Sequence, residues 1–257
     1  MRKWVADLHV HTLLSPCAAV EMTPRNIVMN AAQNGINLIA VTDHNVSGNV
    51  MAALRAGAHY DVKVWPGIEV ETKEGGHVVA LFDSLAKLCA FQNIIDDNML
   101  PVKNDIDKFG RQFIVDEEDN FVTEEERLLL TSIELDVHRI VLHVEQLGGV
   151  CIAAHIDRPA YSLLSYLGFI PASSGLAAVE ISRNSLRELT EKKLACRVGN
   201  LPYVTNSDSH SIEAFLTGPK NHIYMKEATI KEFKLALLGR EGRFIKAGQQ
   251  INNSRLF

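Results

Sequence analysis

The sequence predicts an α/β fold, because short apolar strand patterns alternate with amphipathic helical patterns along most of its 257 residues. The composition fits a globular protein, with 47% hydrophobic and 22% charged residues. No apolar run approaches the roughly 18 residues needed to span a membrane. We therefore expect a single domain over residues 1–257, built on a parallel sheet that is either open or closed into a barrel.

The first strands and helices follow one another closely. Thr23 as N-cap, Pro24 at the first helical position and Gly35 just past the end predict a helix. A second helix is expected over residues 46–60. The apolar segments expected to be strands are 4–11, 37–44, 62–71 and 77–83, with the turn KEGG between the last two.

Residues 84–131 interrupt this alternation, and we expect them to form an inserted flap or small subdomain. The stretch QFIVDEEDNFVT is typical of a hairpin around an acidic turn, whose carboxylates we expect to be solvated. Thr123 and Glu126 stand at capping-box spacing, which predicts that TEEERLLL begins a helix.

The alternation resumes after the insertion. An apolar stripe between Ile133 and Leu147 predicts a helix. The polar tail, residues 247–257, is expected to fray. Further strands are expected at 150–155, 177–182 and 202–208, and helical segments at 162–168, 184–198 and 229–239.

Cysteine usage and charge restrict the compartment and the partners. The four cysteines are scattered without a CxxC pair, which suits a reducing compartment. The N-terminus MRKWVADLHVHT has no apolar stretch of signal-peptide type, so we expect a cytoplasmic protein with no membrane partner. A net charge of −5 gives no reason to expect long nucleic acid as a partner, whereas a small phosphate ester remains compatible with bound metal cations.

Polar side chains collect where the predicted strands end, and the carboxyl ends of strands are where α/β folds place their sites. Imidazole and carboxylate together are the usual donors for zinc, manganese and iron. A buried hydrogen-bond network would not explain this clustering, and there are too many groups for one ion. We therefore expect two or three ions bridged by a carboxylate such as Glu69. The groups are His9, His11, Asp43, His44, Glu69, His77, His155, Asp208 and His210.

The segments DLHVHT, TDHN, GIEV, GGHVVAL, AAHIDRP and NSDSH resemble, in this order, the motifs of the PHP domain (polymerase and histidinol phosphatase) family. The resemblance extends over residues 4–225. It implies a distorted (β/α)7 TIM-like barrel with a metal cluster at the carboxyl ends of the strands. It also implies a metal-dependent phosphoesterase that uses two or three zinc, manganese or iron ions.

The resemblance also implies a role for each ligand. His9 and His11 resemble ligands of the first metal, Asp208 completes that site, and Glu69 bridges to the second metal. The mechanism implied is hydrolysis of a small phosphate ester or nucleotide end by a metal-activated hydroxide that attacks phosphorus. Glu69, Asp208 and His210 are the residues expected to act directly in this reaction, and phosphate is expected as product or bound anion.

The remaining ligands complete a second and a third site. His77 and His155 resemble ligands of the second metal, and His44 and His210 resemble ligands of a third. Cys17 stands where the family commonly has a further third-site ligand, often histidine. A thiolate suits zinc and suits manganese poorly, so either Cys17 is a ligand of the third metal or the third site is weak or empty.

Two arginines and two aspartates are expected to support the site. Arg158 and Arg183 follow predicted strands and should face the barrel mouth, where guanidinium suits phosphate. The alternative for both is a salt bridge to the acidic insertion. Asp7 and Asp43 are expected to orient ligating imidazoles.

Two other functions remain compatible with these motifs. One is an exonuclease acting on short oligonucleotides, and the other is a non-catalytic module that uses metal for stability or partner binding. The sequence contains no GxSxG elbow, P-loop or GxGxxG, so serine-hydrolase, NTPase and dinucleotide functions have no starting point.

Overall fold

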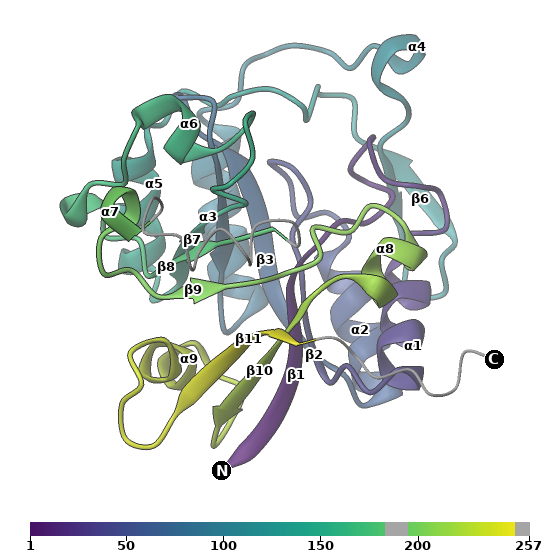
Figure 1. Cartoon of the computed structure of the whole chain (residues 1–257). Coiled ribbons are helices and arrows are strands. Elements are labelled where there is room, and N and C mark those ends of the chain that lie inside the picture. The colour runs from purple at the N-terminus through teal and green to yellow at the C-terminus, as the bar shows by residue number, and fades with distance from the viewer. Residues whose placement is uncertain (183–194, 250–257) are drawn as a thin grey trace.

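The computed structural model describes residues 1–182 and 195–249, which form a nine-stranded sheet covered by helices (Figure 1). The strand order is β11-β10-β1-β2-β3-β4-β7-β8-β9, and β5 and β6 form a separate pair. The strands are β1 Arg2–Val10, β2 Leu38–Val41, β3 Lys63–Glu71, β4 His77–Leu81, β5 Phe113–Val115, β6 Phe121–Glu124, β7 Val150–Ala153, β8 Ala178–Glu180, β9 Tyr203–Val204, β10 Lys220–Met225 and β11 Phe244–Gln249. The helices are α1 Pro24–Gln33, α2 Val50–Tyr60, α3 Leu85–Asp96, α4 Ile106–Phe109, α5 Val137–Gln146, α6 Leu163–Leu167, α7 Ala195–Val198, α8 Ile212–Thr217, α9 Ile230–Leu237 and the 3₁₀ turn Ala172–Ser174.

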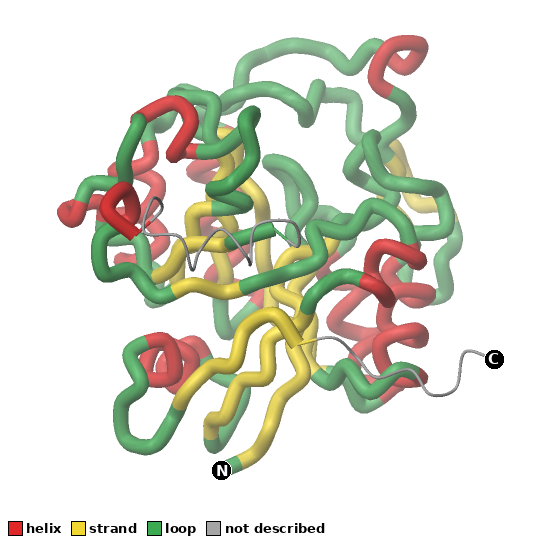
Figure 2. The backbone as a smooth tube through the Cα atoms, viewed as in Figure 1, coloured by secondary structure: helices red, strands yellow, loops and turns green. Residues whose placement is uncertain are grey.

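The sheet curls until its two end strands approach each other, which makes it a nearly closed barrel (Figure 2). The Gly248 amide of β11 donates to Thr205 Oγ1, directly after β9, at 2.7 Å. Thr205 also exchanges two hydrogen bonds with the Asn221 side chain on β10. The α/β barrel predicted from the sequence is therefore confirmed.

The strand directions explain why the barrel is distorted. Pairs β1/β2, β2/β3, β7/β8 and β8/β9 are parallel, as the alternation of strand and helix requires. Strand β4 is antiparallel to both β3 and β7. Strands β10 and β11 were not predicted: β10 pairs antiparallel with β1, and β11 pairs antiparallel with β10. The sheet is therefore mixed, because β3 returns through a short turn at 72–76 that leaves no room for a crossover helix.

A register shift in β1 decides which side chains enter the site. The pairing of β1 with β2 is irregular between Asp7 and Val10. Before the shift, Leu8 packs in the inner cluster of the barrel, and after it Val10 packs in the outer cluster. Strict alternation, which places Asp7 on the same face as His9, therefore fails here, because a bulge re-aims the side chains that follow it.

Two apolar layers hold the barrel together. The inner layer includes Trp65 and Phe233, whose rings meet edge to face at 5.3 Å, so that α9 closes the end of the barrel away from the site. Trp65 Nε1 also donates to the Ala228 carbonyl at 3.0 Å. The outer layer lies between the strands and helices α1, α2, α3 and α5. Because α9 closes that end, the opening for ligands is at the carboxyl ends of the strands.

The segment 84–131 contains a helix, α3, that was not predicted, and the predicted hairpin β5/β6. The predicted helix over TEEERLLL is wrong: Thr123 lies in β6, and no helix follows it before α5. The carboxylates at the hairpin tip were expected to be solvated, but two of them have partners on helices. Asp119 accepts from the Thr23 hydroxyl at the start of α1, and Glu117 pairs with Arg55 of α2, so the hairpin tip is tied to two helices. 

The polar tail begins later than expected, because residues 247–249 belong to β11. The helix predicted over 184–198 falls largely outside the described residues, which contain only its end, α7. None of the described helices has the length and apolarity required to cross a membrane.

Candidate metal centre

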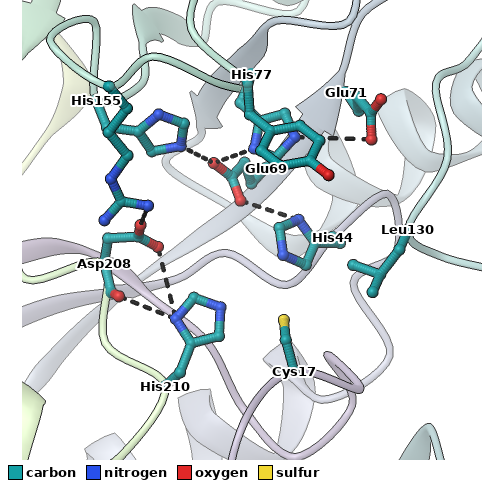
Figure 3. Close-up of a pocket in the computed structure, with 11 residues that line it drawn as sticks. Cys17, His44, Glu69, Glu71, His77, Leu130, His155, Asp208 and His210 are labelled. Atoms are coloured by element: carbon teal, nitrogen blue, oxygen red, sulfur yellow. Dashed lines mark hydrogen bonds and ion pairs between the residues drawn. The ribbon is translucent and has the colours of Figure 1, made fainter. Parts of the chain in front are cut away.

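One carboxylate, Glu69, lies at the centre of the polar groups at the strand ends (Figure 3). It is fully buried, and its strand β3 positions it by backbone bonds to the loop after β2: the Glu69 amide donates to the Asp43 carbonyl, and the Asn45 amide donates to the Glu69 carbonyl. Five imidazole nitrogens lie 3.0–3.3 Å from its two oxygens, and they belong to His9, His11, His44, His77 and His155. The structure therefore brings together ligands that the sequence separates by up to 146 positions.

Four donor atoms form a compact inner set, defined as His9, His11, Glu69 and Asp208. The Nε2 atoms of His9 and His11 are 3.2 Å apart. Asp208 Oδ1 lies 3.3 Å from the first and 3.1 Å from the second. All four residues are at most 6% exposed at the side chain, so the set is removed from bulk solvent.

Hydrogen bonds on the far side of each ring fix the tautomers of His9 and His11. His9 Nδ1 faces both oxygens of Glu180 at 3.0–3.1 Å, so it carries the proton. Ser15 donates its hydroxyl to Asp43 and accepts from His11 Nδ1 at 3.0 Å. When both rings are neutral, the two Nε2 atoms therefore point lone pairs at each other, and a proton or a metal cation between them makes this arrangement favourable.

The donor atoms of the inner set show whether a metal ion fits there. Two imidazole lone pairs and two carboxylate oxygens converge within hydrogen-bond distance in a buried place, which is the donor set that zinc, manganese and iron take. The residues present therefore fit a divalent ion in the inner set.

Two further sets share ligands with the inner set. His44, Glu69 and His77 can hold a second ion, and His155 Nε2 lies 3.2 Å from the same carboxylate. His11, His44 and His210 form the third, which we call the outer set. 

His210 shows the same fixation of a tautomer, because its Nδ1 donates to the Asp208 carbonyl at 3.0 Å and leaves Nε2 free. Two ligands adopt strained backbones: φ is +25° at His155 and +46° at Asp208. Strain of this kind, in residues other than glycine, collects at functional sites.

The ionisation of the cluster shows how strongly it attracts positive charge. Burial opposes charge on both Glu69 and Asp208, but the surrounding imidazoles, His9 foremost, hold the pKa of each carboxyl well below its usual value. Burial likewise opposes a charge on His9, yet Glu180, Glu69 and Asp208 raise its pKa well above the usual value. A divalent cation competes with the protons that this cluster otherwise holds.

The imidazoles at the outer edge behave differently. Burial, reinforced by the neighbouring His11, lowers the pKa of His210 to about 3. Burial also lowers the pKa of His44. Both rings are therefore neutral, which is the form that binds a metal, and His210 in this environment is a poor proton donor.

Cys17 lies beside the outer set but does not belong to any of the donor groups found among the described residues. Figure 3 shows its sulfur directed into the space beside His44 and His210. Burial first, and then the carboxylates Glu69 and Asp208, raise the pKa of the thiol to about 12. In this environment the thiol is neutral unless a metal displaces its proton.

The aspartates predicted to orient imidazoles differ in their partners. Asp43 acts on His11 through Ser15, as described above, and also accepts from the Thr12 amide and hydroxyl at 2.7 Å. Asp7 instead pairs with the fully buried Lys220 at 2.9 Å and accepts from the Ser207 amide. This differs from the predicted role, because the bulge in β1 turns Asp7 away from the imidazoles.

Of the two predicted phosphate-binding arginines, the structure places one. Arg158 lines the cavity above the cluster, with its Nη1 2.6 Å from Asp208 Oδ2 and its side chain 44% exposed. Arg158 therefore pairs with an aspartate of the site, and the alternative expectation of a salt bridge to the acidic insertion is wrong for this arginine. Arg183 lies outside the described residues.

Two residues that orient imidazoles of the site, Glu180 and Ser15, were missed. Glu180 is the last residue of strand β8, so its position at a strand end was a signal that could have identified it. Ser15 gives no such signal. Asn45, with φ +54°, donates to the Leu129 and Thr131 carbonyls and so fixes the end of the segment 84–131 against the site.

A cavity of about 280 Å³ opens above the metal ligands. Its wall consists of Cys17, His44, Glu69, Glu71, His77, Leu130, His155, Arg158, Tyr161, Asp208 and His210. Seven of the nine expected metal ligands therefore line one cavity, and only His9 and His11 do not.

Comparison with known proteins identifies the family. The model of the PHP domain matches residues 7–216, which includes every ligand named above. The chain belongs to the PHP domain family. 

Relatives in this family differ in length and in what their names describe. The Bacillus subtilis protein YqxK is 25% identical over 98% of this chain and 66% of its own. The 3′,5′-nucleoside bisphosphate phosphatase of Chromobacterium violaceum is 34% identical over 28% of this chain and 25% of its own. The lesion-specific endonuclease EndoQ of Pyrococcus furiosus superposes with a TM-score of 0.69 at 21% identity, over 95% of this chain and 58% of its own. This chain thus spans less than two thirds of YqxK and of EndoQ, and the likeness to EndoQ concerns the fold.

Proposed function

We propose that this protein is a metal-dependent phosphoesterase that hydrolyses a small phosphate ester or a nucleotide end. The observation that carries the proposal is the pair of facing Nε2 atoms of His9 and His11, 3.2 Å apart and flanked by two buried carboxylates. The inner set would hold one ion, His44, Glu69, His77 and His155 a second, and the outer set a third. When bound, such ions activate water and neutralise charge on a phosphoryl group.

The chain's own residues supply the rest of the chemistry. Arg158 presents a guanidinium at the cavity, where it can bind two phosphoryl oxygens and stabilise the charge that develops on them. Glu180 and Ser15 hold His9 and His11 in the orientation that directs Nε2 into the site. The small, partly enclosed cavity restricts water around the ester.

The metal dependence can be tested on purified protein. We expect two or more metal equivalents per chain and hydrolysis of phosphomonoesters or diesters that is lost on chelation and restored by zinc, manganese or iron. His9→Ala should remove metal and most activity together. The matched control is His138→Ala, since His138 is exposed on α5 away from the cavity.

Each outcome has a separate meaning. Wild-type activity in His9→Ala with lowered metal content would contradict the cluster mechanism. Bound metal with no turnover on monoesters, diesters or short oligonucleotides would favour a non-catalytic metal-binding module. Release of mononucleotides from oligonucleotide ends, with no monoester hydrolysis, would favour the exonuclease. The cytoplasmic location and the absence of long nucleic acid among the substrates stay predictions.

A further inference from the structure

Tyr161 is an aromatic residue on the cavity wall that belongs to neither the metal ligands nor the core. Its side chain is 52% exposed, and its ring centroid lies 5.0 Å from that of His77 with the planes inclined by 35°. An exposed ring of this size contributes little to folding. Its position beside a metal ligand is therefore the feature that needs an explanation.

The backbone holds this ring in place at the expense of a strained conformation. Tyr161 has φ +59°, a value that glycine adopts most easily. Its carbonyl accepts from the His77 amide at 2.9 Å, and the next residue, Ser162, donates its hydroxyl to the Ile156 carbonyl. A side chain at Gly76 would collide with the Leu163 backbone, so the turn before His77 is packed directly onto this segment. These contacts fix the segment that carries Tyr161 against the turn before His77.

The wall of the cavity divides into two kinds of surface. Leu130 and Tyr161 present its apolar area, whereas the remaining lining residues are thiol, imidazole, carboxyl and guanidinium groups. The ionisable part suits a phosphoryl group. At about 280 Å³ the cavity holds that group and part of the alcohol, and the remainder of a larger ester must lie at the rim.

We propose that Tyr161 is a platform for the leaving group, and that the enzyme prefers phosphate esters of nucleosides to those of plain sugars. This rests on the phosphoesterase function proposed above. Every nucleobase offers a planar face that can stack on tyrosine, whichever hydrogen-bond donors and acceptors its edge carries. Arg158, three residues before Tyr161, places a phosphate-binding group on the same segment.

Adenosine 5′-monophosphate and ribose 5-phosphate test this directly, because they differ only in the base. For the metal-loaded enzyme we expect kcat/KM to be about tenfold higher for the nucleotide, mainly through KM, since the stacking is made equally in the ground and transition states. Tyr161→Asn removes the ring while tolerating a positive φ, and should bring the ratio close to one. Tyr161→Phe should keep the preference.

Tyr166→Asn is the matched control, because Tyr166 lies on the same segment, is 54% exposed and does not line the cavity. It should leave the ratio unchanged. A wild-type ratio near one, or a Tyr161→Asn variant with an unchanged melting temperature that keeps the preference, would overturn the inference while the phosphoesterase function stands.

Failure of the phosphoesterase function is distinguished by calorimetry. If the wild type hydrolyses neither these two compounds nor the diesters and short oligonucleotides named above, that function fails, and binding of the same two compounds still decides the role of Tyr161. We expect the nucleotide to bind about tenfold more tightly to the wild type and with no advantage to Tyr161→Asn. Equal binding of both compounds to the wild type would overturn the inference.

Discussion

The inner and outer ligand sets share His11 but differ in how firmly the protein holds them. In the inner set every side chain is buried, and Glu180 and Ser15 fix both imidazole tautomers. In the outer set the side chain of His210 is 30% exposed. His210 is oriented by a hydrogen bond to the backbone carbonyl of Asp208 and by stacking on His11 at 4.2 Å, and not by a charged partner behind the ring as His9 is.

The difference shows that pre-organisation, and not the number of donors, separates the two sets. A buried carboxylate beside imidazoles of fixed tautomer loses little freedom when a cation binds. In the outer set, water competes with the partly exposed imidazole of His210 for the metal ion. We therefore expect chelators to remove metal from the outer set before the inner set, and four substitutions test this comparison.

Glu69→Gln should have the largest effect, because Glu69 belongs to the inner set and to the neighbouring set with His44 and His77. We expect kcat to fall by about 10³-fold, as when a central charge-stabilising group is lost, and metal content to fall by at least one equivalent. Elemental analysis and steady-state kinetics measure both. The control is Glu134→Gln, at an exposed ion pair with Lys73. Full metal content in Glu69→Gln would show that the bridge is not required.

Lys220→Met should be next, since it leaves Asp7 buried without its partner. We expect the free energy of unfolding to fall by about 3–5 kcal/mol in urea denaturation. The double variant Asp7→Asn/Lys220→Met should recover much of the loss, because no uncompensated charge remains. A single variant as stable as the wild type would mean that water reaches Asp7.

Glu180→Gln separates the two sets most sharply. It removes the charge that faces His9 Nδ1 but does not touch His44 or His210. Affinity of the inner set for metal should fall by about 10–100-fold, with the outer set unaffected. Competition with a chelator of known affinity measures this. Equal weakening of all sites would show that Glu180 supports the barrel as a whole.

Cys17→Ser should have the smallest effect. If the thiol binds an ion in the outer set, zinc stoichiometry falls by at most one equivalent and activity by less than about tenfold, while manganese-dependent activity does not change. Identical zinc stoichiometry in the variant and the wild type would show that the outer set is complete without Cys17.

The sequence by itself determined the alternation of strands and helices, the position of the site at the strand ends and the donors that meet there, whereas closure into a barrel was implied by the family resemblance. Apolar periodicity follows from burial of one face, and strand-end polarity follows from the position of the opening, so both are local properties. The first helix was predicted to its cap for the same reason: Thr23 accepts from the Asn26 amide, and Pro24 starts the helix.

Only the tertiary structure decided the bulge, the mixed strand directions and the partners of each ligand. Side chains alternate along a regular strand, which would place Asp7, His9 and His11 on one face, but an irregular pairing with β2 separates Asp7 from the other two. Such a shift depends on the neighbouring strand and has no local signature. The same holds for Glu180 and Ser15, and for the strained backbone of Tyr161, because each is fixed by residues distant in the chain that only folding brings into contact.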